Sequence, residues 1–229
     1  MPDGSSQWVT QSGTGNPTMS KAVNKCIQEI KKHEVRKQGK KSNAKRDLKQ
    51  PEFKKTLEIL RSLKGFVYQT KIPAMLSLQF QLIGQTDDIC RLETKDIQEH
   101  EEFPEFALQT KVAWSKNVTE ERDCPDQIIL GANDPDFCAL LSLAGYLESH
   151  FSKQWGTPRF LFGERDSDDE PLRMNNNYMN ALKRVWKTHQ FQQIAGEVCG
   201  EIGTHSIRKF ASTWASEHGM SPSKVEIRG

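Results

Sequence analysis

The amino-acid sequence predicts a mainly α-helical fold with one small antiparallel β-sheet, an α+β fold. Apolar residues recur at three- and four-residue spacing in residues 51–91 and again in residues 137–214, which is typical of helices packed on a core. Between these regions, residues 106–114 alternate apolar and polar side chains, the period of a half-buried strand. The 229 residues suffice for one sizeable hydrophobic core.

Composition divides the chain into three parts. Residues 1–19 are rich in Gly, Ser, Thr and Asn, and we expect a disordered N-terminus because few apolar side chains offset the entropy lost on ordering. Residues 20–45 are predicted to form a helix, from Ser20 to about His33, followed by a basic linker. Residues 46–229 are expected to form the globular domain.

Three helices are predicted before the strands. The first begins at Pro51, which suits a first helical turn, and ends at Gly65. The second begins at Pro73 and ends at Gly84, and it is expected to be buried because it is apolar on nearly every side. Thr86 is predicted to cap a short third helix, whose first turn holds two aspartates.

Two short strands are predicted in the middle of the chain. They cover residues 106–114 and 127–130, and a polar turn that includes Lys116 joins them.

Helices return in the last third of the sequence. Pro135 is placed to begin one helix, Asp166–Glu170 is expected to be an exposed acidic loop, and Asn175–Asn177 is expected to cap the next helix. Thr204 is predicted to cap the last complete helix, which ends at Gly219.

Composition also excludes several classes of protein. No apolar run approaches the roughly 18 residues that a membrane helix needs, and the N-terminus lacks the pattern of a secretory signal. We therefore expect a nuclear or cytoplasmic protein. The five cysteines form no C-x-x-C pair and the histidines lack ligand spacing, so no disulfide framework, metal site or cofactor is predicted.

Positive charge is concentrated near the N-terminus. Residues 21–55 hold 13 Lys/Arg against 4 Asp/Glu, although the whole chain has a net charge of only +2. Such a segment is typical of an arm that neutralises DNA phosphates and releases their counterions, although a solvated lysine-rich helix fits the charge equally well. The predicted DNA-binding residues are Lys31, Lys32, Arg36, Lys37, Lys40, Lys41, Lys45 and Arg46.

The sharpest local motif is His205-x-x-Arg208 in the last predicted helix. Residues three apart share a helix face, so His205 and Arg208 point the same way while Ile207, Phe210 and Trp214 turn to the core. A guanidinium can hold a phosphate by two parallel hydrogen bonds, and an imidazole can donate a third or move a proton. On its own, such a pair is most often two polar residues on the solvent-exposed face of a helix.

The sequence around this motif resembles a known family. The run 203–215, GTHSIRKFASTWA, resembles the second signature box of tyrosine recombinases, the integrase and Cre-like family. Within that family, it resembles the eukaryotic Crypton-type transposon recombinases. The resemblance implies DNA cleavage by a tyrosine that forms a 3′-phosphotyrosine intermediate without a metal. It also implies that cationic side chains, including His205 and Arg208, stabilise the transition state.

Two further positions follow from the resemblance. Residues 82–97 resemble the first signature box, and aligning Asp88 with its acidic residue places Gln85 where the first catalytic arginine stands. Glutamine donates hydrogen bonds but supplies no charge, and loss of one such donor costs about 10² to 10³ in rate. Lys116 resembles the lysine of the family's β-hairpin, which protonates the leaving 5′-oxygen; otherwise it is an ordinary hairpin lysine.

The nucleophile is missing from the expected place. In the family the tyrosine lies downstream of the second box, but here the chain stops 21 residues after Arg208. The three tyrosines, Tyr68, Tyr146 and Tyr178, lie upstream in apolar contexts. We therefore expect residues 46–229 to be a C-terminally incomplete catalytic-type domain, inactive in this form.

Three hypotheses remain open on the sequence alone. The leading hypothesis is a recombinase or integrase-like protein of transposon origin that binds double-stranded DNA and self-associates on it. The second is a non-enzymatic DNA-binding regulator on the same fold, which Gln85 favours. The third is an unrelated helical interaction domain, in which the basic arm serves as a nuclear localisation signal.

Overall fold

A computed structural model describes residues 15, 16, 18, 20–38, 45–112, 126–151, 158–164, 166–196 and 201–228. The chain forms two compact units, residues 1–44 and residues 45–229, which are described separately. In the first unit, helix α1 (Lys21–Gln38) extends further than the predicted end at His33. Its side chains through residue 33 are exposed, and Val23, Ile27 and Ile30 form an apolar stripe on it.

Four helical segments form the first half of the second unit. Helix α2 (Gln50–Ser62) is followed by a π-helix, η2 (Val67–Lys71), which leads into α3 (Ile72–Leu82) and then α4 (Thr86–Arg91). Every residue from Lys71 to Phe80 is buried, as the nearly all-apolar sequence predicts. Thr86 is the first helical residue rather than the cap, because the extended backbone ends one residue earlier, at Gln85.

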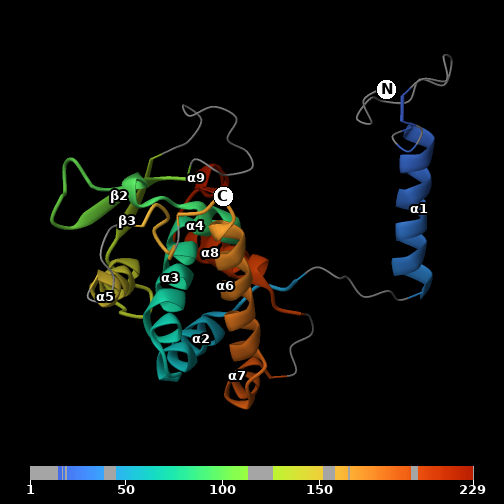
Figure 1. Ribbon diagram of the computed structural model, residues 1–229. Coiled ribbons are helices and arrows are strands. Elements are labelled where there is room, and N and C mark those ends of the chain that lie inside the picture. Colours follow the sequence, from blue (N-terminus) through green and yellow to red (C-terminus); the bar gives the residue numbers. More distant parts are fainter. Residues whose placement is uncertain are drawn as a thin grey trace. The chain divides into compact units, whose positions relative to one another are not determined.

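The sheet is antiparallel and has the strand order β1-β2-β3 (Figure 1). After a 3₁₀ turn, η3 (Thr94–Asp96), come β1 (Ile97–Glu99), β2 (Ala107–Lys111) and β3 (Asp126–Leu130). Strand β2 is shorter than the predicted 106–114, and residues 113–125 lie outside the described part. The short β1 has exposed polar residues and no alternation, so its strand forms through pairing with β2.

Five further helices complete the described part of the second unit. They are α5 (Ala139–Phe151), α6 (Glu170–Trp186), α7 (His189–Ala195), α8 (Thr204–Glu217) and α9 (Pro222–Arg228). Strand β3 contacts both α3 and α5, which places the sheet at one edge of the helical body (Figure 1). No helix within the described ranges is long and apolar enough to cross a membrane.

Several predicted helix starts are wrong by a few residues. Pro135 lies in a turn, and α5 begins only at Ala139. Helix α6 begins at Glu170, not at Asn175–Asn177, because Pro171 occupies its first turn. Glu170 is therefore not part of an exposed acidic loop: it is buried and hydrogen-bonded to Arg173 at 2.7 Å. Thr204 is the first residue of α8 rather than its cap, which is Gly203.

An aromatic cluster anchors α8 in the core. The Phe210 ring lies 5.5 Å from Phe53 and 5.2 Å from Phe80, measured between ring centroids, and Trp214 stacks on Phe137 at 5.1 Å. These residues come from α2, α3 and α8 and from the turn before α5. Because the rings fix the rotation of α8 about its axis, they also determine which of its side chains face outward.

Candidate nucleic-acid interface

Helix α8 presents His205 and Arg208 on its outward side. Ser206, Ile207, Phe210 and Ala211 are buried. Ser206 closes the first turn, where its Oγ accepts a hydrogen bond from the Gly203 amide at 3.0 Å. The predicted orientation of the motif is therefore confirmed, with His205 exposed and Arg208 half-buried.

Hydrogen bonds also hold the turn before α4 in place. The backbone N–H of Gln85 donates to Asp88 Oδ2 at 2.9 Å. Beneath it, Gln79 Nε2 donates to the Gly84 carbonyl at 3.2 Å, and Tyr178 donates its hydroxyl proton to Gln79 Oε1 at 2.8 Å. Gln79 is fully buried, and its hydrogen bonds link α3 and α6 to Gly84, the residue that precedes Gln85.

The fold brings Gln85, His205 and Arg208 together around one cavity of about 230 Å³. Gln85 is more than a hundred positions from His205 and Arg208 in the chain, and helix α6 closes the cavity with Asn175 and Met179. A second cavity of about 570 Å³ shares His205 and Arg208 and continues along α8. The second cavity adds Asp47, Lys209, Ser212 and Thr213.

The site holds charges of both signs, because Asp87 lines the first cavity together with Arg208, and Asp47 lines the second. Arg208 lines both cavities, and the structure gives its guanidinium no hydrogen bond or ion pair with any other described residue. Burial raises the pKa of Asp88 above its usual value, and the charge of the nearby Arg208 acts in the opposite direction. Arg91 does not line the cavity but pairs with Asp87, which does: its Nε donates to the Asp87 carboxylate at 2.8 Å.

Other predicted DNA-binding residues have varied positions. Lys31 and Lys32 are exposed on α1, which also contains Arg36 and Lys37. Lys116, Lys40 and Lys41 lie outside the described residues, as do the side chains of Arg36 and Lys37.

Lys45 and Arg46 make contacts inside the second unit. Lys45 forms an ion pair with Glu201. Arg46 makes two hydrogen bonds to the carboxylate of buried Glu52, at 2.8 and 2.5 Å, and its own side chain is only 11% exposed. Because a buried carboxylate needs a close cation, Arg46 has a structural role and is not available to a phosphate.

None of the three tyrosines lines the cavity that contains Arg208. Tyr178 is fully buried, and burial raises the pKa of its hydroxyl well above the usual value. Tyr146 is also buried and donates to the Leu161 carbonyl at 3.0 Å. Tyr68 lines a different cavity. The chain as described therefore supplies no nucleophilic tyrosine to this site.

Sequence reasoning missed the contributions of α3 and α6 to the site. Gln79 is one of three polar residues in a mostly apolar helix, and this was a usable signal because a buried amide needs partners. Asn175 and Met179 carried no such signal, because their role depends on how α6 packs beside α4.

Comparisons with known proteins support the fold. No protein-family model matches this sequence, and no curated protein matches it either. Among solved structures, a lambda integrase dimer bound to a COC′ core site covers 90% of this chain, with 14% identity and a TM-score of 0.52. Another structure of a lambda integrase dimer bound to a COC′ core site covers 91%, with 12% identity and a TM-score of 0.52.

The similarity concerns one part of those larger proteins. This chain spans 66% of the first lambda integrase chain and 56% of the second. XerA recombinase is also similar, with 15% identity and a TM-score of 0.49, over 82% of this chain and 60% of its own. The second unit therefore has a tyrosine-recombinase-like fold, mainly helical with a small antiparallel sheet, and the predicted fold class is confirmed.

Proposed function

We propose that this protein binds double-stranded DNA through the α8 cavity, as a recombinase or integrase-like protein that does not cleave DNA in this form. The observation that carries the proposal is the meeting of Gln85, His205 and Arg208 around one cavity on a tyrosine-recombinase-like fold. The two lambda integrase structures are dimers bound to DNA, and they motivate both the DNA partner and self-association on it.

The chemistry of the cavity suits one phosphate of the DNA backbone. Arg208 offers parallel N–H groups to two phosphate oxygens, and His205 offers an imidazole N–H to a third. Gln85 adds an uncharged amide donor. In the family's chemistry a lysine at the position of Lys116 protonates the leaving oxygen, but without a tyrosine at this site no covalent intermediate forms.

Origin and cellular location remain part of the same proposal. The run 203–215 supports descent from a Crypton-type transposon recombinase, and the basic segment supports a nuclear location. A regulator that binds DNA without catalysis is the second candidate. Gln85 favours it, because replacing the first catalytic arginine removes a charge that chemistry needs more than binding does.

The experiment is a titration of duplex DNA at several salt concentrations. Arg208→Ala should weaken DNA binding about tenfold or more at low salt. It should also reduce the slope of log affinity against log salt concentration by about the value of one phosphate contact. Thermal stability should change little, because the guanidinium has no described partner in the fold.

Lys64→Ala is the matched control, since Lys64 is an exposed cation that does not line the cavity. Equal losses of affinity in the two variants, or no binding by the native chain at low salt, would refute the proposed site. A covalent protein–DNA adduct would show that the chain cleaves DNA after all.

A further inference from the structure

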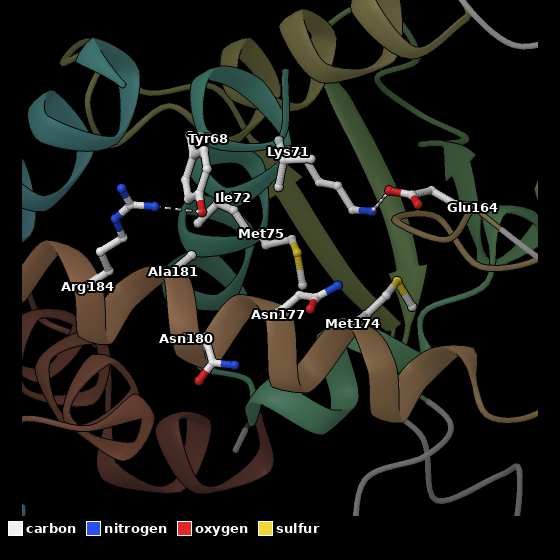
Figure 2. Close-up of a pocket in the computed structure, with 11 residues that line it drawn as sticks. Tyr68, Lys71, Ile72, Met75, Glu164, Met174, Asn177, Asn180, Ala181 and Arg184 are labelled. Atoms are coloured by element: carbon white, nitrogen blue, oxygen red, sulfur yellow. Dashed lines mark hydrogen bonds and ion pairs between the residues drawn. The ribbon is translucent and has the colours of Figure 1, made fainter. Parts of the chain in front are cut away.

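A separate cavity of about 430 Å³ lies between the η2–α3 segment and α6 (Figure 2). Helix α6 lines it with Met174, Asn177, Ala181 and Arg184. At about 100° per residue, these positions lie on a different face of the helix from Asn175 and Met179, which line the cavity of Arg208. The volume falls in the range of small-molecule sites, roughly 300–1,000 Å³.

The wall opposite α6 is a π-helix. Val67, Tyr68 and Lys71 of η2 all line the cavity, and Ile72 and Met75 of α3 continue it. A π-helical turn is rare and occurs frequently at functional sites. Here the irregular turn coincides with the cavity.

One end of the cavity is electrically neutral. Lys71, which is largely buried, pairs with Glu164 at 3.0 Å, as Figure 2 shows. Arg173 also reaches Glu164, at 3.2 Å, and pairs with Glu170 at 2.7 Å. Two cations and two carboxylates therefore balance one another at this end.

The other end holds one uncompensated cation. The Arg184 guanidinium lies over the Tyr68 ring, 5.8 Å from its centroid, and makes a long hydrogen bond of 3.5 Å to the Tyr68 hydroxyl. It has no carboxylate partner in the described part of the chain. Between the two ends, Asn177 reaches toward the Met75 side chain (Figure 2).

We propose that this cavity binds a small organic anion with a flat apolar body. The apolar body would lie against Ile72, Met75 and Met174, because thioethers adapt to and attract aromatic rings. The single anionic group would lie at Arg184, where it gains a charge-assisted hydrogen bond. Asn177 would bond to a polar atom on the body of the ligand.

The test uses two probes that share an apolar body. 8-Anilinonaphthalene-1-sulfonate carries one anionic group, and N-phenyl-1-naphthylamine is its uncharged counterpart. Each is titrated against the full 229-residue chain by fluorescence, without DNA. The sulfonate should saturate a site that includes Arg184 and bind about tenfold or more tighter than the uncharged probe.

Three variants decide the outcome. Arg184→Gln should weaken sulfonate binding about tenfold and leave the uncharged probe unchanged, and Asn177→Trp should fill the cavity and weaken both probes. Lys183→Gln, an exposed neighbour that does not line the cavity, should change neither.

Sulfonate binding that Arg184→Gln and Asn177→Trp leave unchanged would overturn the proposal, as would equal losses in Arg184→Gln and Lys183→Gln. Both cavity substitutions are at exposed positions, and an unchanged melting temperature shows that they fold. Because no DNA is present, failure here is distinct from failure of the proposed function.

Discussion

At the scale of single residues, the candidate site is one charge short of the tyrosine-recombinase pattern that the sequence resembles. Gln85 stands where the resemblance expects an arginine, and it faces the same cavity as His205 and Arg208. Its backbone is held by Asp88, so the position is ordered although the side chain is neutral. The position therefore fits the proposed phosphate site but adds no positive charge to it.

Gln85→Arg should strengthen DNA binding. The new guanidinium adds a charge-assisted contact, so we expect about tenfold higher affinity at low salt and a steeper salt dependence, by about one contact. Dissociation constants measured across a salt series check this result. Gln98→Arg adds the same charge at an exposed position of β1, and an equal gain there would mean that only net charge matters.

At the scale of elements, the site depends on how α3, α6 and α8 hold their polar residues. The aromatic cluster fixes α8, while Gln79 of α3 ties Tyr178 of α6 to the Gly84 turn. Neither contact involves a charged side chain. Both act by positioning Gln85, His205 and Arg208, which line the cavity.

Tyr178→Phe should weaken this link. Removing the hydroxyl leaves the buried Gln79 oxygen without its donor, at a cost of about 1–3 kcal/mol in the free energy of unfolding. We also expect DNA binding to weaken about threefold, because the Gln85 turn loses support. Tyr146→Phe removes a comparable buried hydroxyl, bonded to Leu161, and should lower stability without changing DNA affinity. If both variants keep native affinity, the link has no positioning role.

At the scale of the whole molecule, the second unit is held together partly by carboxylates that are paired with cations. Hydrogen bonds from Lys95 and Arg159 lower the pKa of Glu93. Burial raises the pKa of Glu164, but hydrogen bonds from Lys71 and Arg173 keep it below its usual value. Burial also raises the pKa of Glu170, and hydrogen bonds from Arg173 and the Glu164 backbone amide keep it low.

Stability should therefore fall in acid. A carboxyl with a lowered pKa in the folded state stabilises the protein fully above its unfolded pKa, here 4.5, and loses that contribution as pH falls through the folded pKa. We expect the free energy of unfolding, measured by urea denaturation, to be steady near pH 6 and to decline below about pH 4.5. Glu93→Gln should make the decline shallower, and an unchanged slope would contradict this assignment.

The whole-molecule comparison also decides between the hypotheses left open by the sequence. The tyrosine-recombinase-like fold contradicts an unrelated helical fold and leaves the function open. It leaves the choice between a recombinase-like protein and a regulator to the DNA-binding experiments. Whether the basic arm contacts DNA is a separate prediction, which concerns the first unit.

Local physics explains what was predictable from the sequence. The helix around Met75 was expected to be buried because it is apolar on nearly every side. The period of two residues indicated strand β2, and the period of 3.6 residues gave the outward direction of His205 and Arg208. Helix starts were less predictable, since Pro135 and Pro171 both suit a first turn and only packing selected one.

The sequence by itself determined the mainly helical fold with a small sheet and the H-x-x-R face of the last long helix, because these depend on spacing along one segment. Only the tertiary structure decided that Gln85 shares a cavity with Arg208, that Arg46 bonds to Glu52, and that Gln79 supports the site. These contacts join side chains from separately positioned elements, and the free energy of packing, not local periodicity, selects such partners.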